Sequence, residues 1–385
     1  MVTRIQFPPN KLPEETVKLR LELRAFLMEE RRSGALPPPD YVGMRVSHDF
    51  TRRLGERGFI GLTWPKEYGG GGRGNLDRYV VTEELLAAGA PVRLHWVTDR
   101  QTGPIIMRFG TEAQKKRYLP DIATGKCVFA IGLSEPDLGS DLASLRTRAT
   151  KVDGGWRING AKLWTSNIHH AQQVLTLART TDSPENRHNG MSQFIVPVPS
   201  PGLTIRPIIN IAHEHDFNEV LFDDVFVADD ALLGVVDQGW QQVGTELAYE
   251  RSGPERWLSA FRLLAQLTEE LGGEIGDATA ASMGRIYSHL LALRQMSLSV
   301  AGMLEIGKAP NLEAAVVKDL GTCFEQEMVR VARDVISSER LDRHRKDHLL
   351  GALLDHGQLW TTAFTIRGGA REVMRGIIAR GLGLR

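Results

Sequence analysis

The first third of the chain places its apolar residues at helical spacing. Leu19, Leu23 and Phe26 fall on one face of a helix, and the charged residues between them fall on the other faces. The same spacing recurs over residues 77–88 and 112–118. We therefore expect this part of the chain to fold as a set of amphipathic helices.

The pattern changes near Val128 to short apolar and β-branched runs that lie between turn signals. Two turn dipeptides, at 153–154 and 159–160, flank a strand at 156–158. Further strands are expected at 174–177, 194–196 and 220–222. Together these runs predict a compact β domain of about seven or eight strands.

Helical spacing returns from residue 238 onward. One long periodic run includes Leu290, Leu291, Leu293 and Met296, and another includes Val316, Val317, Leu320, Met328 and Val331. Long amphipathic helices packed as a bundle account for both runs. We expect an α+β multidomain fold with helices at 1–127, a β domain at 128–237 and a helical bundle at 238–385.

Charge and composition narrow the class of protein. Lys and Arg number 47 and Asp and Glu number 47 in the 385 residues, so the formal net charge is zero. Nucleic acids and anionic membranes attract an excess of cations, so neither is expected as the main partner. No apolar run approaches the ~20 residues that span a bilayer. Cys127 and Cys323 are too few for a disulfide framework or a zinc site, and we expect a cytoplasmic protein.

Two motifs suggest other chemistry but have simpler explanations. The glycine run at 69–74 fits G-x-G-x-x-G, yet Pro65 argues against the strand that a dinucleotide site requires before it. His213 and His215 alternate as metal ligands can, but they lie beside turn residues and outside an H-E-x-x-H helix. We expect loops at both places and no metal site.

Two other segments are compatible with a flavin site, although composition alone favours an ordinary serine-capped turn for the first and a strand with a core tryptophan is the alternative for the second. Residues 132–141 combine two hydroxyls, three acids and two glycines, where hydroxyls and exposed N–H groups can bind an isoalloxazine edge and a pyrophosphate. Some twenty residues later, Trp164 precedes Ser166 by two positions. An aromatic ring can pack on one flavin face while a nearby hydroxyl reaches N5.

With these segments in this order, the chain resembles the acyl-CoA dehydrogenase family. The stretches around Phe109, Phe222 and Gly368 agree with it as well, so the resemblance covers essentially the whole chain. It implies an N-terminal helical domain, a central β-barrel-like domain and a C-terminal four-helix bundle. It also implies FAD as cofactor, a CoA thioester as substrate and an electron-transferring flavoprotein as electron acceptor.

The resemblance also assigns roles to residues. It implies that the flavin lies along Leu133, Ser134, Gly139 and Ser140, that Trp164 packs on its ring and that Ser166 bonds to N5. Glu372 falls where many members carry a glutamine that touches FAD.

The base that removes the α-proton is expected at an unusual position. Most members carry a glutamate before the Gly-Thr of their last motif, where this chain has Gly368. A minority, which includes isovaleryl-CoA-type enzymes, carry it just before an arginine in the C-terminal domain, and Glu250 followed by Arg251 fits that place. We therefore expect Glu250 to be the base, with Arg251 and Gly369 at the substrate.

The chain departs from homotetrameric members in lacking two segments that reach the FAD of a neighbouring subunit. This pattern resembles the heteromeric acyl-CoA dehydrogenases of steroid-degrading bacteria, in which two unlike chains build one flavin site. A homo-oligomer and a heterotetramer with a related chain both stay open, and a steroid-derived acyl-CoA is the expected substrate. The alternatives are a non-catalytic partner subunit, which needs no base, and an acyl-CoA oxidase, which reduces oxygen directly.

Overall fold

The computed structural model describes residues 4–36, 45–249, 252–341 and 348–384, with only the backbone described for 245–249. The chain forms two compact units. The helical unit comprises Met1–Val46, Arg73–Val92 and Glu250–Arg385, and the sheet unit comprises Ser47–Gly72 and Arg93–Tyr249. The helical unit therefore joins two N-terminal stretches to the C-terminal part of the chain.

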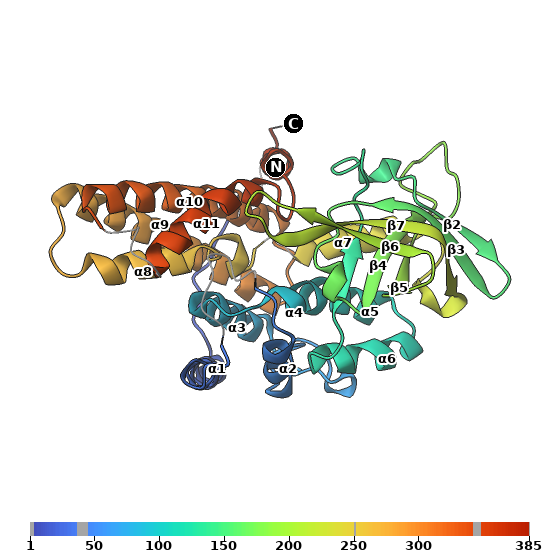
Figure 1. Ribbon diagram of the computed structural model, residues 1–385, viewed down its shortest axis with the longest axis horizontal. Helices are drawn as coiled ribbons and strands as arrows, with labels where there is room; N and C mark the ends of the chain where they lie inside the picture. Colours follow the sequence, from blue (N-terminus) through green and yellow to red (C-terminus); the bar gives the residue numbers. More distant parts are fainter. Residues whose placement is uncertain (1–3, 37–44, 250–251, 342–347, 385) are drawn as a thin grey trace. The chain divides into compact units, whose positions relative to one another are not determined.

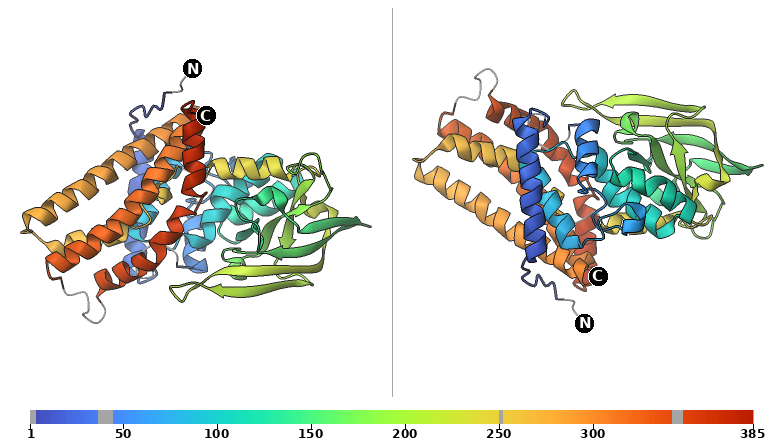
Figure 2. Two further views of the ribbon diagram at one scale, coloured as in Figure 1. Left: turned by 90° about the horizontal axis from the view of Figure 1, so that it is seen from above. Right: turned by 90° about the horizontal axis from the view of Figure 1, so that it is seen from below.

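The helical unit is built around long antiparallel helices. Its elements are α1 (Glu14–Arg32), α3 (Asn75–Ala88), η6 (Pro254–Arg256), α8 (Phe261–Leu271), α9 (Asp277–Glu305), α10 (Asn311–Ser338), α11 (Leu349–Trp360), η7 (Thr361–Thr365) and α12 (Arg371–Gly381). Helix α10 contacts α8, α9, α11 and α12, and Figure 2 shows α9 and α10 running alongside each other. This arrangement confirms the expected C-terminal bundle.

The N-terminal helices join this bundle through α3. Helix α3 contacts α1 on one side and α9 on the other. The expected apolar face of α1 is confirmed, since Leu19, Leu23 and Phe26 are all buried. In the bundle, however, Leu291 and Leu320 are exposed although they fall within the periodic runs. Hydrophobic spacing marks a helix correctly, but each of these two residues lies outside its buried stripe.

The sheet unit contains eight strands and several short helices (Figure 1). The strands are β1 (Phe129–Gly132), β2 (Arg148–Val152), β3 (Gly155–Lys162), β4 (Gln173–Arg179), β5 (Met191–Pro197), β6 (Leu203–Ile209), β7 (His215–Ala228) and β8 (Leu232–Leu233). Their order is β6-β7-β3-β2-β4-β5-β8, and β1 pairs with β4 in parallel. The predicted number of strands is confirmed.

Helices surround the sheet within the same unit. They are α2 (His48–Glu56), η1 (Lys66–Tyr68), α4 (Arg93–Val97), the π-helical turn η2 (Thr98–Thr102), α5 (Gly103–Phe109), α6 (Glu112–Ala123), η3 (Leu142–Ser144), η4 (Ile168–His170), η5 (Asp229–Ala231) and α7 (Gly239–Tyr249). One core cluster joins Ile105 and Leu119 of these helices to Phe129, Leu175 and Ile195 of the sheet. The cluster holds the start of β1 in place, and the first flavin motif begins at the last residue of this short strand, Gly132.

One predicted turn is wrong. Asn159-Gly160 lies inside β3 and not at its end, and the pairing of β3 with β7 shifts register between Ile158 and Gly160. The φ angle of Gly160 is +145°, and a β-carbon there would stand 2.6 Å from the hydroxyl of Thr147. The glycine therefore serves a bulge, which bends β3 as it approaches Lys162 and Trp164.

Candidate active site

The first flavin motif forms a tight loop after β1. Glu135 and Leu138 exchange backbone hydrogen bonds of 2.9 and 3.0 Å, which closes a turn. Leu133, at the start of the loop, packs against a core cluster formed by Leu145, Leu177, Met191 and Val243. Val243 belongs to α7, so the helix that leads to Glu250 shares a core with this loop.

The second motif lies directly beside the first. The backbone N–H of Leu163 donates to the carbonyl of Ser134 at 2.8 Å, so the two segments form neighbouring strands of chain. Trp164 follows with a φ of +61° and with 55% of its surface exposed. Its only ring contact among the described residues is edge-on with Phe217, at 5.7 Å between centroids. A large ring in this strained conformation and still open to solvent is typical of a residue that packs on a ligand.

The hydroxyls of the two motifs are available for a ligand. The side-chain hydroxyls of Ser134, Ser140 and Ser166 make no hydrogen bond among the residues that the structure describes. Around Gly139 a β-carbon would meet no atom within 4 Å. Free hydroxyls, an open backbone position and an uncovered indole together match the polar edge and flat face of an isoalloxazine ring, so these residues fit FAD.

An arginine that the sequence analysis missed fixes the far end of the second motif. Arg93 donates through Nε to the side-chain oxygen of Asn167 at 2.9 Å, and its Nη2 lies 2.9 Å from Asp216 Oδ1. Asn167 adopts a left-handed conformation with a φ of +57°. No sequence motif contains Arg93, and only its burial together with Asp216 reveals the contact.

The last motif of the chain lies in the helical unit. Gly368 and Gly369 have φ angles of +74° and +104°, and Glu372 is exposed in the first turn of α12. The N–H of Gly369 donates to the carbonyl of Ile366 at 3.1 Å. A β-carbon at Gly368 would stand 2.7 to 2.8 Å from the three guanidinium atoms of Arg256. The side-chain space at position 368 is therefore filled by a buried cation.

A buried polar cluster surrounds this arginine. Arg256 Nη1 donates to the carbonyl of Arg367 at 3.3 Å, and Arg367 Nη2 lies 3.3 Å from the carboxylate of Glu325. Burial raises the pKa of Glu325. Lys318 donates to the carbonyl of Phe364 at 3.2 Å, and burial together with Arg256 lowers the pKa of Lys318 to about 8. These contacts fix the chain on the N-terminal side of the two glycines.

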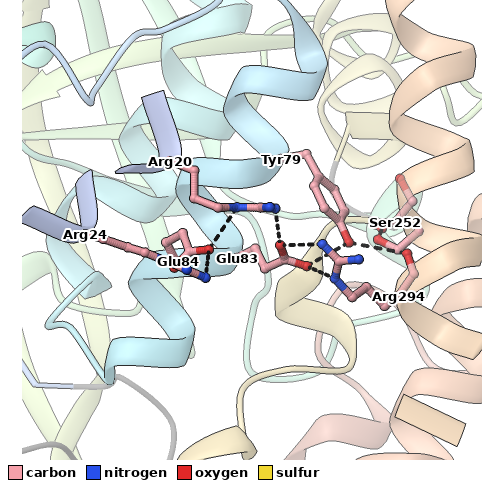
Figure 3. A network of polar contacts seen from close by, with 8 residues as sticks. Arg20, Arg24, Tyr79, Glu83, Glu84, Ser252 and Arg294 are labelled. Carbon is pink, nitrogen blue, oxygen red and sulfur yellow. Dashed lines mark hydrogen bonds and ion pairs between the residues drawn. The ribbon is translucent and has the colours of Figure 1, made fainter. Parts of the chain in front are cut away.

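Glu250 and Arg251 lie outside the described residues, but the chain that follows them is firmly held. Ser297 Oγ of α9 donates to the carbonyl of Ser252 at 2.6 Å. Tyr79 of α3 directs its hydroxyl at Glu83 and at the carbonyl of Arg294, each at 3.3 Å. Figure 3 shows this network between α3, α9 and the backbone at Ser252.

Two arginines share the carboxylate of Glu83. Arg294 makes two contacts with it, at 2.7 and 3.0 Å, and Arg20 of α1 lies 2.9 Å away (Figure 3). Arg20 and Arg24 also bind Glu84 on the next position of α3. Paired charge-assisted hydrogen bonds of this kind fix both distance and direction, so α1, α3 and α9 are held in one arrangement next to Ser252.

Two histidines of the sheet unit stack on each other near the second motif. The rings of His169 and His215 are 3.8 Å apart, and Asn218 bonds to both. Within the described ranges, no three His, Cys, Asp or Glu side chains converge in a way that could hold a metal ion. No helix of the described part of the chain combines the length and apolar content needed to cross a membrane.

Comparisons with known proteins match this chain over most of its length. The family model for the acyl-CoA dehydrogenase N-terminal domain matches residues 13–126, and the model for the acyl-CoA dehydrogenase middle domain matches residues 130–225. Acyl-CoA dehydrogenase FadE26 of Mycobacterium tuberculosis is 32% identical over 97% of both chains. Acyl-CoA dehydrogenase IpdE1 of the same organism is 33% identical over 90% of both.

Solved structures show the same fold. A chain of the Tcur3481-Tcur3483 steroid ACAD superposes with a TM-score of 0.86 at 30% identity, covering 97% of this chain and 98% of that one. A chain of the ChsE4-ChsE5 complex from Mycobacterium tuberculosis gives a TM-score of 0.84 at 30% identity, covering 97% and 99%. With two family models in the expected order and relatives matched over nearly their full length, the chain belongs to the acyl-CoA dehydrogenase family.

Proposed function

We propose that this chain is an FAD-dependent acyl-CoA dehydrogenase that converts an acyl-CoA thioester to the 2,3-enoyl-CoA and passes the electrons to an electron-transferring flavoprotein. The observation that carries the proposal is the pairing of the two flavin motifs through Leu163 and Ser134. This pairing brings the uncovered ring of Trp164 next to a loop with free hydroxyls.

The residues that would hold FAD come from both motifs. In this proposal Leu133, Ser134, Gly139 and Ser140 would contact one edge, and Trp164 and Ser166 would supply the face and a hydroxyl. Glu372 is proposed as a further cofactor contact. When bound, FAD supplies the acceptor for the hydride that leaves the β-carbon. The chain's own residues bind, orient and shield the substrate.

The proton step belongs to Glu250 in this proposal. An ordinary glutamate has a pKa of about 4.3, so it removes an α-proton efficiently only in a dry site that raises its pKa. Gly368 stands where most members of the family carry the base, and the guanidinium of Arg256 fills the space that a side chain there would need. This packing supports Glu250 as the base. Arg251 is proposed to hold the CoA-bound substrate. Gly369 is proposed to face the thioester. Its backbone N–H would then donate both to the thioester and to the carbonyl of Ile366.

A second, related chain is the proposed partner. Each of the two structures named above carries a pair of names in its title, Tcur3481-Tcur3483 and the ChsE4-ChsE5 complex. On α10 and around α12, Leu320, Ile366 and Val373 are exposed, at 46%, 69% and 44%. Exposed apolar groups on neighbouring elements are typical of a protein interface, which supports an oligomer without identifying the second chain. The steroid name of the Tcur3481-Tcur3483 neighbour supports a bulky, steroid-derived acyl group as substrate.

The experiment purifies the chain alone and co-expressed with a related acyl-CoA dehydrogenase chain, and records the visible spectrum and the mass in solution. We expect FAD at full occupancy only in the two-chain complex, and bleaching of the flavin by an acyl-CoA. A homodimer of this chain saturated with FAD would overturn the shared site. Oxygen consumption without an added acceptor would instead indicate an oxidase, and an inactive chain that supports its partner's site would indicate a non-catalytic subunit.

A further inference from the structure

A lysine and a glutamate form a buried ion pair where the two flavin motifs meet. Lys162 is the last residue of β3, and its side chain is fully buried. Its Nζ lies 2.9 Å from Glu135 Oε1 and donates to the carbonyl of Leu133 at 3.1 Å. One ammonium group therefore contacts the first residue of the loop and the acid at its centre.

The glutamate extends these contacts to the far side of the loop. Glu135 Oε2 accepts from the N–H of Arg146 at 2.7 Å, and Oε1 accepts from the N–H of Thr147 at 2.9 Å. Residues 146 and 147 follow the loop in the chain and lie directly before β2. The carboxylate thus connects the two ends of the loop that contains Gly139 and Ser140.

Both groups are charged at neutral pH. Burial lowers the pKa of Lys162 to about 8 despite the neighbouring carboxylate. Burial alone would raise the pKa of Glu135, but Lys162 and the hydrogen bonds to this carboxylate lower it overall. The loop is therefore held by an ion pair in which the ammonium group and both carboxylate oxygens have hydrogen-bond partners.

Such a pair is poorly explained as a source of stability. Removing two charges from water is costly, and apolar residues of similar volume often stabilise a core equally well or better. What apolar residues cannot do is orient the Leu133 carbonyl and the two N–H groups at 146 and 147. Directed contacts that support a site from behind are how proteins fix the groups that touch a ligand.

We infer that Lys162 and Glu135 are a positioning pair for FAD, because they fix Leu133 and the loop on one side and the start of the Trp164 segment on the other. The inference rests on the proposed flavin site. Neither side chain needs to contact the cofactor, since each acts through the backbone that it holds. Their charges also lie beside the flavin segments, so the balance between them is expected to tune the reduction potential of bound FAD.

The test uses Lys162→Met and Glu135→Gln in the preparation that holds FAD, whether the chain alone or the two-chain complex. We expect each variant to raise the dissociation constant of FAD on the order of tenfold or more, as loss of an outer positioning contact does at metal sites. The midpoint potential of FAD is expected to fall in Lys162→Met, which loses a cation, and to rise in Glu135→Gln, which loses an anion. If the pair served stability alone, the two variants would not shift the midpoint potential in opposite directions.

Two further variants keep the test decisive. Lys162→Arg retains the charge and is expected to restore part of the FAD affinity that Lys162→Met loses. Phe194→Leu, in the buried core of β5 of the same unit, is expected to lower the melting temperature while leaving the FAD affinity unchanged. Wild-type affinity and potential in both charge variants, or potentials that move in the same direction, would overturn the inference. A wild-type protein that binds no FAD in either preparation would instead refute the proposed function.

Discussion

The guanidinium carbon of Arg256 lies 2.7 Å from the point where a β-carbon at Gly368 would stand. Gly368 also has a φ of +74°, which side chains rarely adopt. Both the backbone and the available space therefore require glycine at the position where most relatives are expected to carry their base. Within the helical unit, the side chain of Arg256 packs in the space that the side chain of that base would occupy.

The cost of adding one methyl group at Gly368 tests this arrangement. Gly307 has the same φ of +74° but no atom within 4 Å of an added β-carbon, so it is a matched control. Gly368→Ala is expected to lower the free energy of unfolding by about 1–3 kcal/mol more than Gly307→Ala, because only the former overpacks a buried site. Urea titrations of both variants measure the difference, and equal losses would show that Arg256 moves aside freely.

Transplanting the base is expected to fail. In a Glu250→Gln background, Gly368→Glu would place a carboxylate against Arg256, whose positive charge lowers the pKa of a neighbouring acid and so weakens it as a base. We expect no recovery of acyl-CoA-dependent flavin bleaching in this double variant. Addition of Arg256→Ala provides the control that removes the cation. Recovery in the double variant would mean that Arg256 does not block the site.

The carboxylate of Glu83 is expected to be a major stabilising group of the helical unit. Glu83→Gln leaves Arg20 and Arg294 with a neutral partner and is expected to lower the free energy of unfolding by about 1.5–3 kcal/mol. Glu15→Gln removes an exposed pair with Lys18, which solvent and salt screen, and is expected to destabilise the fold much less. Chemical unfolding compares the two, and similar losses would contradict a special role for the buried network.

Acid stability is expected to depend on His169. Burial, together with the nearby His170, His215 and Arg93, lowers its pKa to about 4. Between pH 6.5 and 4 the unfolded chain therefore binds a proton that the folded chain does not, so His169 destabilises the fold as the pH falls through this range.

Replacing the imidazole tests this dependence. His169→Phe keeps an aromatic ring against His215 and is expected to flatten the fall of the melting temperature between pH 6.5 and 4. His213→Asn provides the control, since His213 is exposed with a φ of +60°, which asparagine tolerates. If the melting temperature of His169→Phe falls with pH as steeply as that of the wild type, other groups cause the loss of stability in acid.

Much of the fold could be predicted because it depends on local patterns. The apolar stripe of α1 and the strands around Val174 and Phe194 follow from spacing and residue type alone. Gly160 shows the limit of such patterns, since Asn-Gly indicates a turn but here forms a bulge against Thr147. A dipeptide cannot reveal which strand it will face.

The contacts that support the site could not be predicted for the same reason. Lys162 and Glu135 are 27 positions apart, and Arg256 and Gly368 are 112 apart, so only the folded chain brings each pair together. The signal that was available is the presence of a lysine and a glutamate inside the two flavin motifs themselves. A lysine or glutamate inside one glycine-containing motif is a candidate for an ion pair with a charged residue of the other motif.

The central claim is that Glu250 is the base of a flavin-dependent acyl-CoA dehydrogenase. The most direct measurement is the rate at which bound FAD is bleached in a single turnover, with wild-type protein and Glu250→Gln compared on the acyl-CoA that reacts fastest in a panel from straight-chain to steroid-derived thioesters. We predict normal FAD content in Glu250→Gln and a rate about 10²–10⁴-fold lower, the usual contribution of a general base. Bleaching of Glu250→Gln at the wild-type rate would contradict the account.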